Sequence, residues 1–286
     1  MSTLAFEKNA LGLPSQLVAF GLVPHLIYSK IPTTPVDGSK QFFLEVPGVA
    51  RFLACPEENC ILIDMAHADV RSHVLNTWLL GTVMAYMLQY HDCLVLHGSA
   101  VLIHSHAVIF SGASGAGKST LASAFAQKGY PFITDDLVVI KKNSQNQYHI
   151  LPGPTTLKLW KDAMTHFQYD WAHAMPVNFK TDKYAIAVDE PCAEPMIPIS
   201  AFYELSATQS PEITIERLHS VEALMLLMNN AYRYFMLKPL GKIKIFFEDC
   251  SALSQRIAIH KLTRTADFHD LPQLIHRIEL NQGVTS

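Results

Sequence analysis

One stretch of the chain has the residue types and spacing of a phosphate-binding loop. Residues 112–119 read G-A-S-G-A-G-K-S and fit the pattern G-x-x-x-x-G-K-[ST] at every fixed position. Glycines let the backbone approach a phosphate, and successive N–H groups at a helix N-terminus donate to its oxygens. In this pattern Lys118 contacts the outer phosphates and the Ser119 hydroxyl ligates Mg²⁺. The residues predicted to contact the nucleotide are Gly112, Ala113, Ser114, Gly115, Ala116, Gly117, Lys118, Ser119 and Thr120.

Two adjacent carboxylates, Asp135 and Asp136, interrupt an apolar run at residues 131–140. Burying such a pair in a strand is unfavourable unless cations or proton transfer compensate for it. Successive residues of a strand face opposite sides, so one carboxylate could reach a metal while the other faces an acceptor. Alternatively, one of them caps a neighbouring loop. Because the phosphate-loop motif lies just upstream, we expect at least one of the two to be functional.

A polar cluster, His97-Gly98-Ser99, lies within the otherwise apolar residues 94–103, in the strand just before the one that leads into the motif. Taken alone, His97 is best explained as a hydrogen-bonded core histidine. Other cations lie farther along the chain, and each is more often solvated than catalytic. They are Lys158, Lys180, Lys183 and Arg233.

The elements that must position the motif have the required order. Residues 106–110 form an apolar run typical of a buried strand, and residues 118–128 are rich in helix formers and end at Gly129. The motif is therefore predicted to join a strand to a helix N-terminus. The chain has neither the N-K-x-D motif of GTPases nor the L-S-G-G-Q signature of ABC transporters, which argues against both classes.

The region before the motif is predicted to be a small α+β unit. Apolar residues at helical spacing predict an amphipathic helix over residues 70–90. Residues 1–38 contain four prolines and favour short extended pieces. An antiparallel meander precedes the helix, with strands at residues 41–46, 50–55 and 60–64.

Strands and helices alternate after the motif, which predicts an α/β fold. No linker, repeat or low-complexity run divides the chain, and we expect the boundary near residues 90–93. The predicted domains are therefore residues 1–91 and 92–286. The later strands are predicted within residues 131–140, 148–160, 182–188, 199–205 and 257–262, and the helices at residues 161–174, 220–237 (with Ser220 as N-cap) and 271–280.

Composition excludes several classes of protein. The chain has 286 residues and a formal net charge of −3, without a block of Lys or Arg, which argues against an electrostatic nucleic-acid binder. Its five cysteines form no C-x-x-C pair and fit the reduced thiols of the cytosol. The most apolar stretch, residues 78–88, is shorter than the roughly 20 residues that span a bilayer. We expect a soluble, cytoplasmic protein without nucleic-acid or membrane partners.

Taken together, these residues resemble the HPr kinase/phosphorylase superfamily, in particular its shorter HPr-kinase-related branch, which includes kinases found with lasso-peptide biosynthesis systems. The resemblance rests on residues 97–101, 111–120, 129–130 and 134–137, and the segment 96–139 carries its specificity. It implies a fold shared with ATP-dependent phosphoenolpyruvate carboxykinases, in which an α/β phosphate-loop core has a mixed sheet. It also implies ATP and Mg²⁺ bound at the loop and phosphate passed to a serine hydroxyl.

Carried over residue by residue, the resemblance implies a role for five side chains. Asp135 accepts the acceptor's proton, His97 stands near the transferring phosphate, and Lys118 holds phosphates; these three are the predicted catalytic residues. Ser119 and Asp136 are the predicted metal ligands.

The sequence also departs from the family pattern. Thr120 stands where HPr kinases usually have Glu after G-K-S, and their long glycine-rich substrate signature has no match downstream. The family's downstream arginine has no clear match either, with Lys180 or Lys183 as substitutes. These departures argue against HPr as the acceptor and against the reverse phosphorolysis.

We predict an ATP-dependent kinase that phosphorylates a serine-like hydroxyl on a peptide, a protein or a small molecule. Phosphoryl transfer depends mainly on alignment and charge neutralisation, which the loop and the carboxylates would supply. Two alternatives stay open at this point: a nucleotide-sensing regulatory scaffold without phosphotransfer, and an ATPase whose hydrolysis drives motion. The oligomeric state is also open, a homo-oligomer included.

Overall fold

The computed structural model describes Leu22 and residues 24–31, 40–177, 181–188, 192–210, 212–265 and 267–284. The chain forms two compact units, Met1–Cys93 with Arg233–Ile245, and Leu94–Tyr232 with Phe246–Ser286, and each is described by itself. The division into domains at residues 91 and 92 stays a prediction. The extended pieces expected in residues 1–38 fall largely outside the described residues, and so does Lys180.

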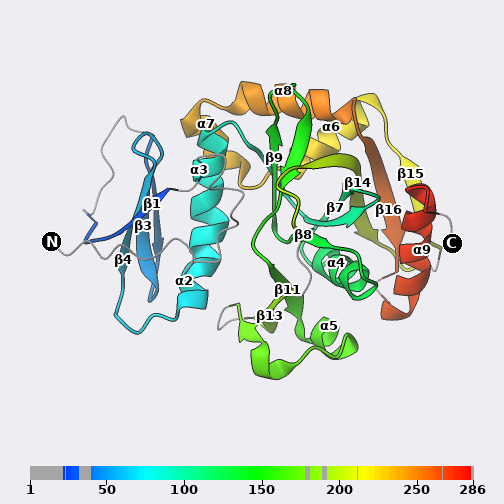
Figure 1. Ribbon diagram of the computed structural model, residues 1–286, viewed down its shortest axis with the longest axis horizontal. Helices are drawn as coiled ribbons and strands as arrows, with labels where there is room; N and C mark the ends of the chain where they lie inside the picture. Colours follow the sequence, from blue (N-terminus) through cyan, green and yellow to red (C-terminus); the bar gives the residue numbers. More distant parts are fainter. Residues whose placement is uncertain are drawn as a thin grey trace. The chain divides into compact units, whose positions relative to one another are not determined.

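The first unit contains a four-stranded sheet and a helical segment (Figure 1). The predicted antiparallel meander is confirmed as β2 (Phe42–Val46), β3 (Ala50–Cys55) and β4 (Cys60–Met65). β1 (His25–Tyr28) adds to it parallel to β4. The predicted helix consists of α2 (Ser72–Trp78), a π-helical turn η2 (Leu79–Val83) and α3 (Met84–Tyr90). The wide turn includes Gly81, a poor helix former. Two short helices complete the unit, η4 (Tyr234–Met236) and α7 (Leu237–Leu240).

The second unit is built around a nine-stranded mixed sheet, so the predicted α/β class with a mixed sheet is confirmed. Its strand order is β5-β9-β10-β14-β7-β6-β8, with β16 on β14 and β15 on β16. β7, β14 and β16 run parallel, whereas the other pairs are antiparallel. The strands are β5 (Leu94–His97), β6 (Ser99–Ile103), β7 (His106–Gly112), β8 (Phe132–Thr134), β9 (Leu137–Lys142), β10 (Tyr148–Leu151), β14 (Ile197–Ala207), β15 (Thr214–Arg217) and β16 (Ala258–Arg264).

A small sheet and several helices complete this unit. The small sheet has the order β11-β13-β12 and is antiparallel throughout. Its strands are β11 (Thr156–Trp160), β12 (Met175–Pro176) and β13 (Lys183–Ala187). The helices are α4 (Lys118–Gln127), α5 (Lys161–His166), η3 (Trp171–His173), α6 (Ser220–Asn229), α8 (Ile243–Ser254), η5 (Phe268–Asp270) and α9 (Leu271–Asn281).

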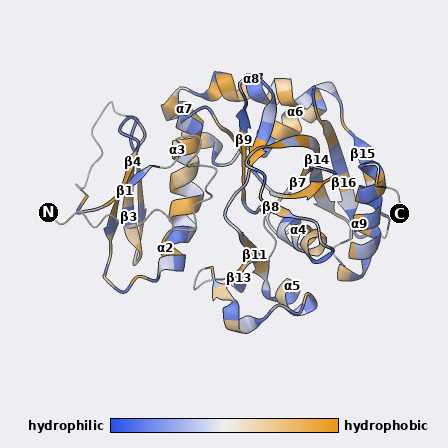
Figure 2. Ribbon diagram, in the orientation of Figure 1, coloured by the Kyte–Doolittle hydropathy of each residue, from blue (hydrophilic) through white to orange (hydrophobic). Residues whose placement is uncertain are grey.

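The core that supports the site lies between α4, α9 and the large sheet. α4 contributes Leu121 and Phe125, and α9 contributes Leu274 and Ile278, all fully buried. Phe110 of β7 stacks on Phe125 with ring centroids 5.5 Å apart. Figure 1 shows α4 and α9 on the same side of β7, and Figure 2 shows hydrophobic residues concentrated around β7 and β14. This core holds α4, and with it the phosphate loop (residues 112–119), against the end of β7.

Two of the predicted elements end earlier than the sequence pattern suggested. The helix predicted over residues 161–174 ends at His166, because Gln168 adopts a left-handed φ of 54°. The helix predicted over residues 220–237 ends at Asn229. There the Asn230 side chain donates to Leu226 O at 2.8 Å, and the chain turns to pair with β5. These endings are set by contacts that helical periodicity does not encode.

Ser220 is not the N-cap of α6. His219 occupies that position and makes no side-chain capping bond, while Ser220 is the first helical residue and has a φ of 50°. The predicted strand over residues 94–103 is likewise two strands, β5 and β6, divided at Gly98. A Cβ at Gly98 would lie 2.7 Å from the Phe110 carbonyl oxygen, so only glycine allows this approach.

Candidate functional site

Several strand ends of the second unit meet at one edge of the large sheet. β7, β14 and β16 run parallel, with Gly112 opposite Leu205 and Ala207 opposite Arg264. β6 is antiparallel to β7, and β8 is antiparallel to β6, so the start of β6 and the end of β8 lie at that same edge. Ligands of α/β proteins bind outside the carboxyl ends of parallel strands. This edge therefore gathers the phosphate loop, the two aspartates and Arg264.

The phosphate loop joins β7 to the N-terminus of α4, as predicted. Gly117 is the N-cap of α4 and has a left-handed φ of 90°, a conformation that side chains disfavour. The Lys118 side chain folds over the loop, and its Nζ donates to the carbonyl oxygens of Gly112 at 2.9 Å and Ala113 at 3.1 Å. Burial lowers the pKa of Lys118, although the two nearby aspartates oppose this change. The loop thus holds a desolvated ammonium beside its exposed backbone.

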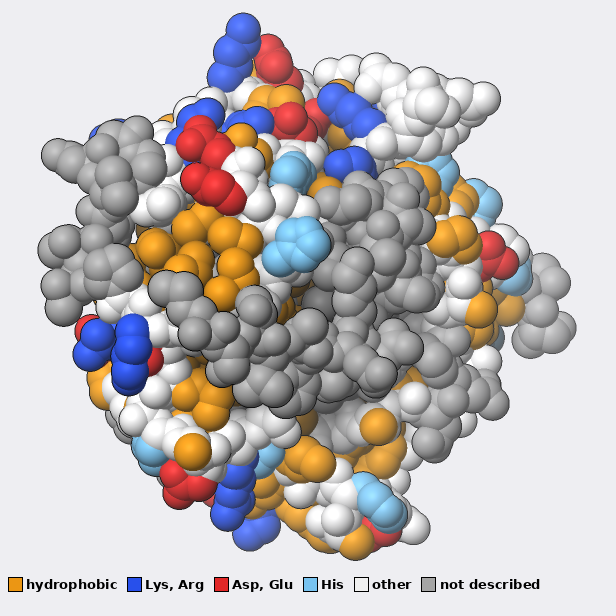
Figure 3. All heavy atoms as spheres, turned by 60° about the vertical axis from the view of Figure 1, so that its left-hand side comes forward, with side chains coloured by type: hydrophobic (Ala, Val, Ile, Leu, Met, Phe, Trp, Pro, Cys, Tyr) orange, Lys and Arg blue, Asp and Glu red, His pale blue; other side chains and the backbone are white. Residues whose placement is uncertain are grey.

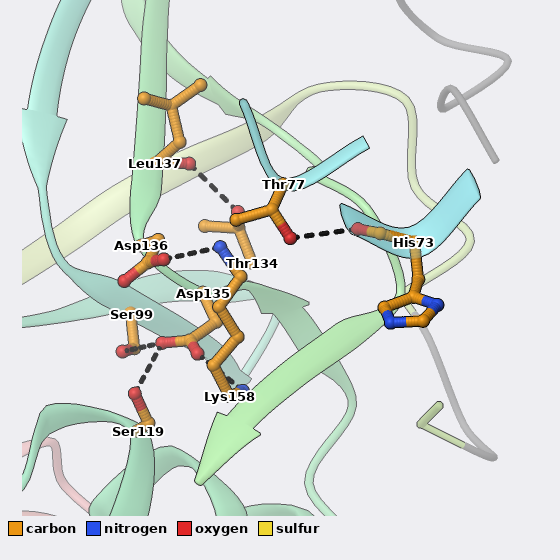
Figure 4. Close-up of polar contacts among 9 residues, drawn as sticks. All are labelled: His73, Thr77, Ser99, Ser119, Thr134, Asp135, Asp136, Leu137 and Lys158. Carbon is orange, nitrogen blue, oxygen red and sulfur yellow. Dashed lines mark hydrogen bonds and ion pairs between the residues drawn. The ribbon is translucent and has the colours of Figure 1, made fainter. Parts of the chain in front are cut away.

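Asp135 joins the loop to the neighbouring strands through three hydrogen bonds (Figure 4). Its Oδ1 accepts from the hydroxyls of Ser119 at 2.8 Å and Ser99 at 2.6 Å. Its Oδ2 accepts from the backbone N–H of Lys158 at 2.9 Å. Burial, followed by the charge of Asp136, raises the pKa of Asp135. This carboxylate is therefore fixed directly against the predicted metal-ligating serine.

Asp136 has different surroundings. It adopts a φ of 68°, which Asp tolerates better than most residues, at the turn between β8 and β9. Its Oδ2 forms an ion pair with Lys158 Nζ at 2.6 Å (Figure 4). Burial alone would raise the pKa of Asp136, but Lys158 and Lys183 hold it well below its usual range. Asp136 is therefore an ionised carboxylate surrounded by cations.

A cavity of about 210 Å³ opens over the loop. In the described part of the chain its lining includes Asp136 but not Asp135, which is 7% exposed. The lining also carries four cationic side chains and three carboxylates, and the cations suit a polyanion such as a triphosphate. These cations are Lys118, Lys158, Lys183 and Arg264.

His97 lines the same cavity from the end of β5. Its backbone N–H donates to Asn230 O at 2.8 Å, and its carbonyl accepts from Ser111 Oγ at 2.8 Å. Its ring stacks on Tyr232, with centroids 5.9 Å apart and planes 8° from parallel. Burial and then Lys118 lower the pKa of His97, which favours the neutral imidazole at neutral pH. His97 is thus a positioned cavity residue and not a core histidine.

Arg264, at the end of β16, is a site residue that the sequence prediction missed. It is 5% exposed, and its Nη2 donates to Ala116 O in the phosphate loop at 2.9 Å. Its Nη1 donates to Thr265 O at 2.5 Å, and its buried Nε has no hydrogen-bond partner in the described part of the chain. A Cβ at Gly117 would collide with Nη2, so this glycine also makes room for the guanidinium. Arg264 supports the loop and faces the cavity.

Lys158 and Lys183, which residue type alone predicts to be solvated cations, both line the cavity. They come from the small sheet, where Lys158 lies on β11, and Lys183 lies on β13 opposite Trp160 of β11. No local sequence signal marks Arg264, Lys158 or Lys183 as site residues, because their positions depend on the pairing of β16 with β14 and on the separate small sheet.

A fit to Mg²⁺ can be judged from the ligand types. Among the described residues, no cluster of three or more His, Cys, Asp or Glu side chains could hold a metal ion by itself. Mg²⁺ is usually held by one or two protein ligands together with substrate phosphates and water. Ser119 Oγ and the adjacent aspartates offer that kind of partial ligand set at the loop.

Two observations concern the described residues and one face of their surface. In the described part, no helix combines the length and apolar character needed to cross a bilayer. On the face drawn in Figure 3, Lys and Arg side chains are interspersed with acidic and apolar ones.

Comparisons with known proteins give limited matches. The sequence model of a family described as SynChlorMet cassette protein ScmC matches residues 57–183, less than half of the chain. That stretch includes the phosphate loop and both aspartates and ends before Arg264. No curated protein matches the chain. Among solved structures, the Hpr(Ser) kinase/phosphatase from Coxiella burnetii is similar at 15% identity over 66% of this chain and 96% of that chain, with a TM-score of 0.35.

Proposed function

We propose that this chain is an ATP-dependent kinase of the HPr-kinase-related type, which transfers the γ-phosphate to a serine-like hydroxyl of a peptide, a protein or a small molecule. The observation that carries the proposal is the hydrogen bond between Ser119 Oγ and Asp135 Oδ1 at 2.8 Å. It joins the phosphate loop to Asp135, and the adjacent Asp136 lines the cavity over the loop. The loop predicts a nucleotide there, and the carboxylates predict metal and proton chemistry.

The loop and the cavity cations would hold ATP. Backbone N–H groups of residues 113–119 and the α4 N-terminus suit the α- and β-phosphates, and Lys118 suits the outer phosphates. Ser119 would ligate Mg²⁺, which when bound neutralises charge on the β- and γ-phosphates. Lys158 and Lys183 line the cavity beside Asp136 and are suited to the charge of the transferring group.

The contacts favour exchanged roles for the two aspartates. The sequence predicted Asp135 as the proton acceptor and Asp136 as the metal ligand. Asp135 bonds to Ser119 and is shielded from the cavity, so we assign it to the metal side. Asp136 lines the cavity with His97, so we assign it to the acceptor side. There it would orient the acceptor hydroxyl and take its proton late, when the oxygen has already become acidic. The neutral His97 would donate to the phosphate or to the acceptor.

The test is incubation with γ-labelled ATP and Mg²⁺ together with a panel of serine-containing peptides and a cell extract. We expect an acceptor to become labelled, and the label to resist hydroxylamine, as a serine phosphate does. The Lys118→Ala variant should produce no label. Release of free phosphate without a labelled acceptor would instead support the ATPase. Tight ATP binding without any turnover would support the sensing scaffold, and absence of ATP binding would reject all three.

A further inference from the structure

The cavity over the phosphate loop has a second, chemically different end. Trp160, Asp162 and Phe268 line it, and the same three residues also line a neighbouring cavity of about 720 Å³. No described residue of the phosphate loop borders that neighbouring cavity. Trp160, Asp162 and Phe268 therefore lie on the side of the first cavity that faces away from the loop.

This end is aromatic and acidic, whereas the loop end is cationic. Trp160 is 41% exposed, and Phe268 is half-buried. The Phe268 ring stacks on His166, with centroids 4.4 Å apart and planes 15° from parallel, so its orientation is fixed. Asp162 and Asp267 add two exposed carboxylates to the same lining. Anionic phosphates are disfavoured beside these carboxylates, but hydroxyl and amino donors are favoured.

The direction of a loop-bound nucleotide points to the same end. Lys118 and Ser119 face the β- and γ-phosphates and the metal, next to Asp135. The nucleoside then extends from the α-phosphate along the cavity, beyond Lys118 and Ser119. Arg264, whose guanidinium contacts Ala116 of the loop, and Phe268 line this one cavity together.

We infer that Trp160 and Phe268 form the subsite for the purine base of the nucleotide, with Asp162 and Asp267 accepting hydrogen bonds from its ribose or amino groups. This inference rests on the proposed function. Aromatic side chains bind nucleobases by stacking, and replacing one by alanine weakens binding by about tenfold or more. His166 holds Phe268 in place, so the stacking surface is already ordered before the ligand binds.

The test compares ATP with inorganic tripolyphosphate, which has the three phosphates but no nucleoside. The binding of each ligand to the protein is measured by calorimetry in the presence of Mg²⁺. We expect Trp160→Ala and Phe268→Ala to weaken ATP binding by about tenfold and to leave tripolyphosphate binding within about twofold. The control is Trp171→Ala, because Trp171 is 44% exposed, packs edge-on against Tyr184 and lies outside the cavity lining.

A second measurement covers the case in which Phe268→Ala unfolds the chain. The chain has three tryptophans, so Trp78→Phe with Trp171→Phe leaves Trp160 as the sole tryptophan, which is excited selectively over tyrosine. We expect ATP to change its fluorescence and tripolyphosphate to leave it unchanged. If Trp160→Ala binds ATP as tightly as wild type does, and ATP causes no fluorescence change of its own, the proposed base subsite is wrong while the proposed function stands. Wild-type protein that binds neither ligand would overturn the proposed function as well.

Discussion

Asp135 and Asp136 are neighbours in sequence but have different surroundings. Asp135 accepts hydrogen bonds from two serine hydroxyls and a backbone N–H, and its pKa is raised by burial. Asp136 forms an ion pair with Lys158, lines the cavity, and has a pKa below its usual range. Because their contacts differ, isosteric replacement of each should give a different defect.

We expect Asp136→Asn to lower the rate of phosphate transfer by about 100-fold or more, because removing a proton acceptor costs roughly that factor. ATP affinity should change little. We expect Asp135→Asn mainly to weaken the dependence of ATP binding on Mg²⁺. Labelled transfer and calorimetry measure the two effects, with the exposed Asp170→Asn as control. Loss of transfer with unchanged Mg²⁺ dependence in Asp135→Asn would restore the division of roles predicted from the sequence.

Arg264 gives a second prediction at this scale. Its guanidinium donates to Ala116 O and to Thr265 O, a two-carbonyl contact that a lysine cannot reproduce. We expect Arg264→Lys to weaken tripolyphosphate binding by about tenfold, since the loop loses a support and the cavity loses a planar donor. The control is Arg256→Lys, because Arg256 also donates to a backbone carbonyl, Asn146 O, but is exposed. An equal effect of both variants would reject a specific role for Arg264.

At the scale of elements, α9 is tied to α4 and β8 through one buried carboxylate. Glu279 Oε1 accepts from Lys128 Nζ at 2.5 Å and from Tyr130 OH at 2.7 Å. Burial alone would raise the pKa of Glu279, but these two bonds lower it. Lys128 follows α4 and Tyr130 precedes β8, so this contact fixes the helix that carries the phosphate loop.

We expect Glu279→Gln to lower the free energy of unfolding by about 2 kcal/mol at pH 7, the cost of disrupting hydrogen bonds to a buried charged group. Because the folded pKa is depressed, this stabilisation is present above the unfolded pKa of about 4.3 and is lost as pH falls through the lower folded value. Urea unfolding at pH 7 measures it, with the exposed Glu57→Gln as control. A change below about 0.5 kcal/mol would show that the contact contributes little.

Elements with strong local signals were predictable from the sequence. The β2–β4 meander and the strand, loop and helix of the motif agree with local apolar patterns and turn residues. The ending of α6 and the break at Gly98 were not predictable, because they depend on distant contacts: the chain after α6 pairs with β5, and Gly98 packs against Phe110. The ending of α5 depends on the left-handed φ of Gln168, which helical periodicity does not encode. The long strand β14 pairs with β10, β7 and β16, and such pairing cannot be read from one segment alone.

For the site too, some residues were predictable from local sequence patterns and others were not. The phosphate-loop pattern and the twin carboxylates identified residues that do lie together at one sheet edge. Lys158, Lys183 and Arg264 reach the cavity from the small sheet and from the last strand, which are far from the motif in sequence. Their side chains became identifiable as site residues only once the topology was known.

At the scale of the whole molecule, His260 should make stability depend on pH. It is 5% exposed, stacks on Tyr203 with centroids 4.8 Å apart, and burial followed by Arg217 lowers its pKa to about 4. Its unfolded pKa is about 6.5, so between these values the unfolded chain binds more protons than the folded one. The free energy of unfolding therefore rises with pH between about 4 and about 6.5, and it falls again when the solution is acidified through this range.

We expect the free energy of unfolding to fall by on the order of 2 kcal/mol between pH 6.5 and pH 4 because of this residue. His260→Phe keeps an aromatic ring beside Tyr203 and should flatten that part of the pH profile. Chemical unfolding at several pH values measures the slope, with the exposed His106→Phe as control. Equal slopes for wild type and His260→Phe would show that His260 is not the group responsible.

The central claim is that the phosphate loop and the carboxylates bind one magnesium nucleotide. Calorimetric titration with ATP, with and without Mg²⁺, tests it most directly in wild type and Ser119→Ala. We predict one site per chain, with Mg²⁺ strengthening ATP binding by about tenfold in wild type and having little effect in Ser119→Ala. Absence of ATP binding in wild type, or an equal Mg²⁺ effect in both proteins, would contradict the account.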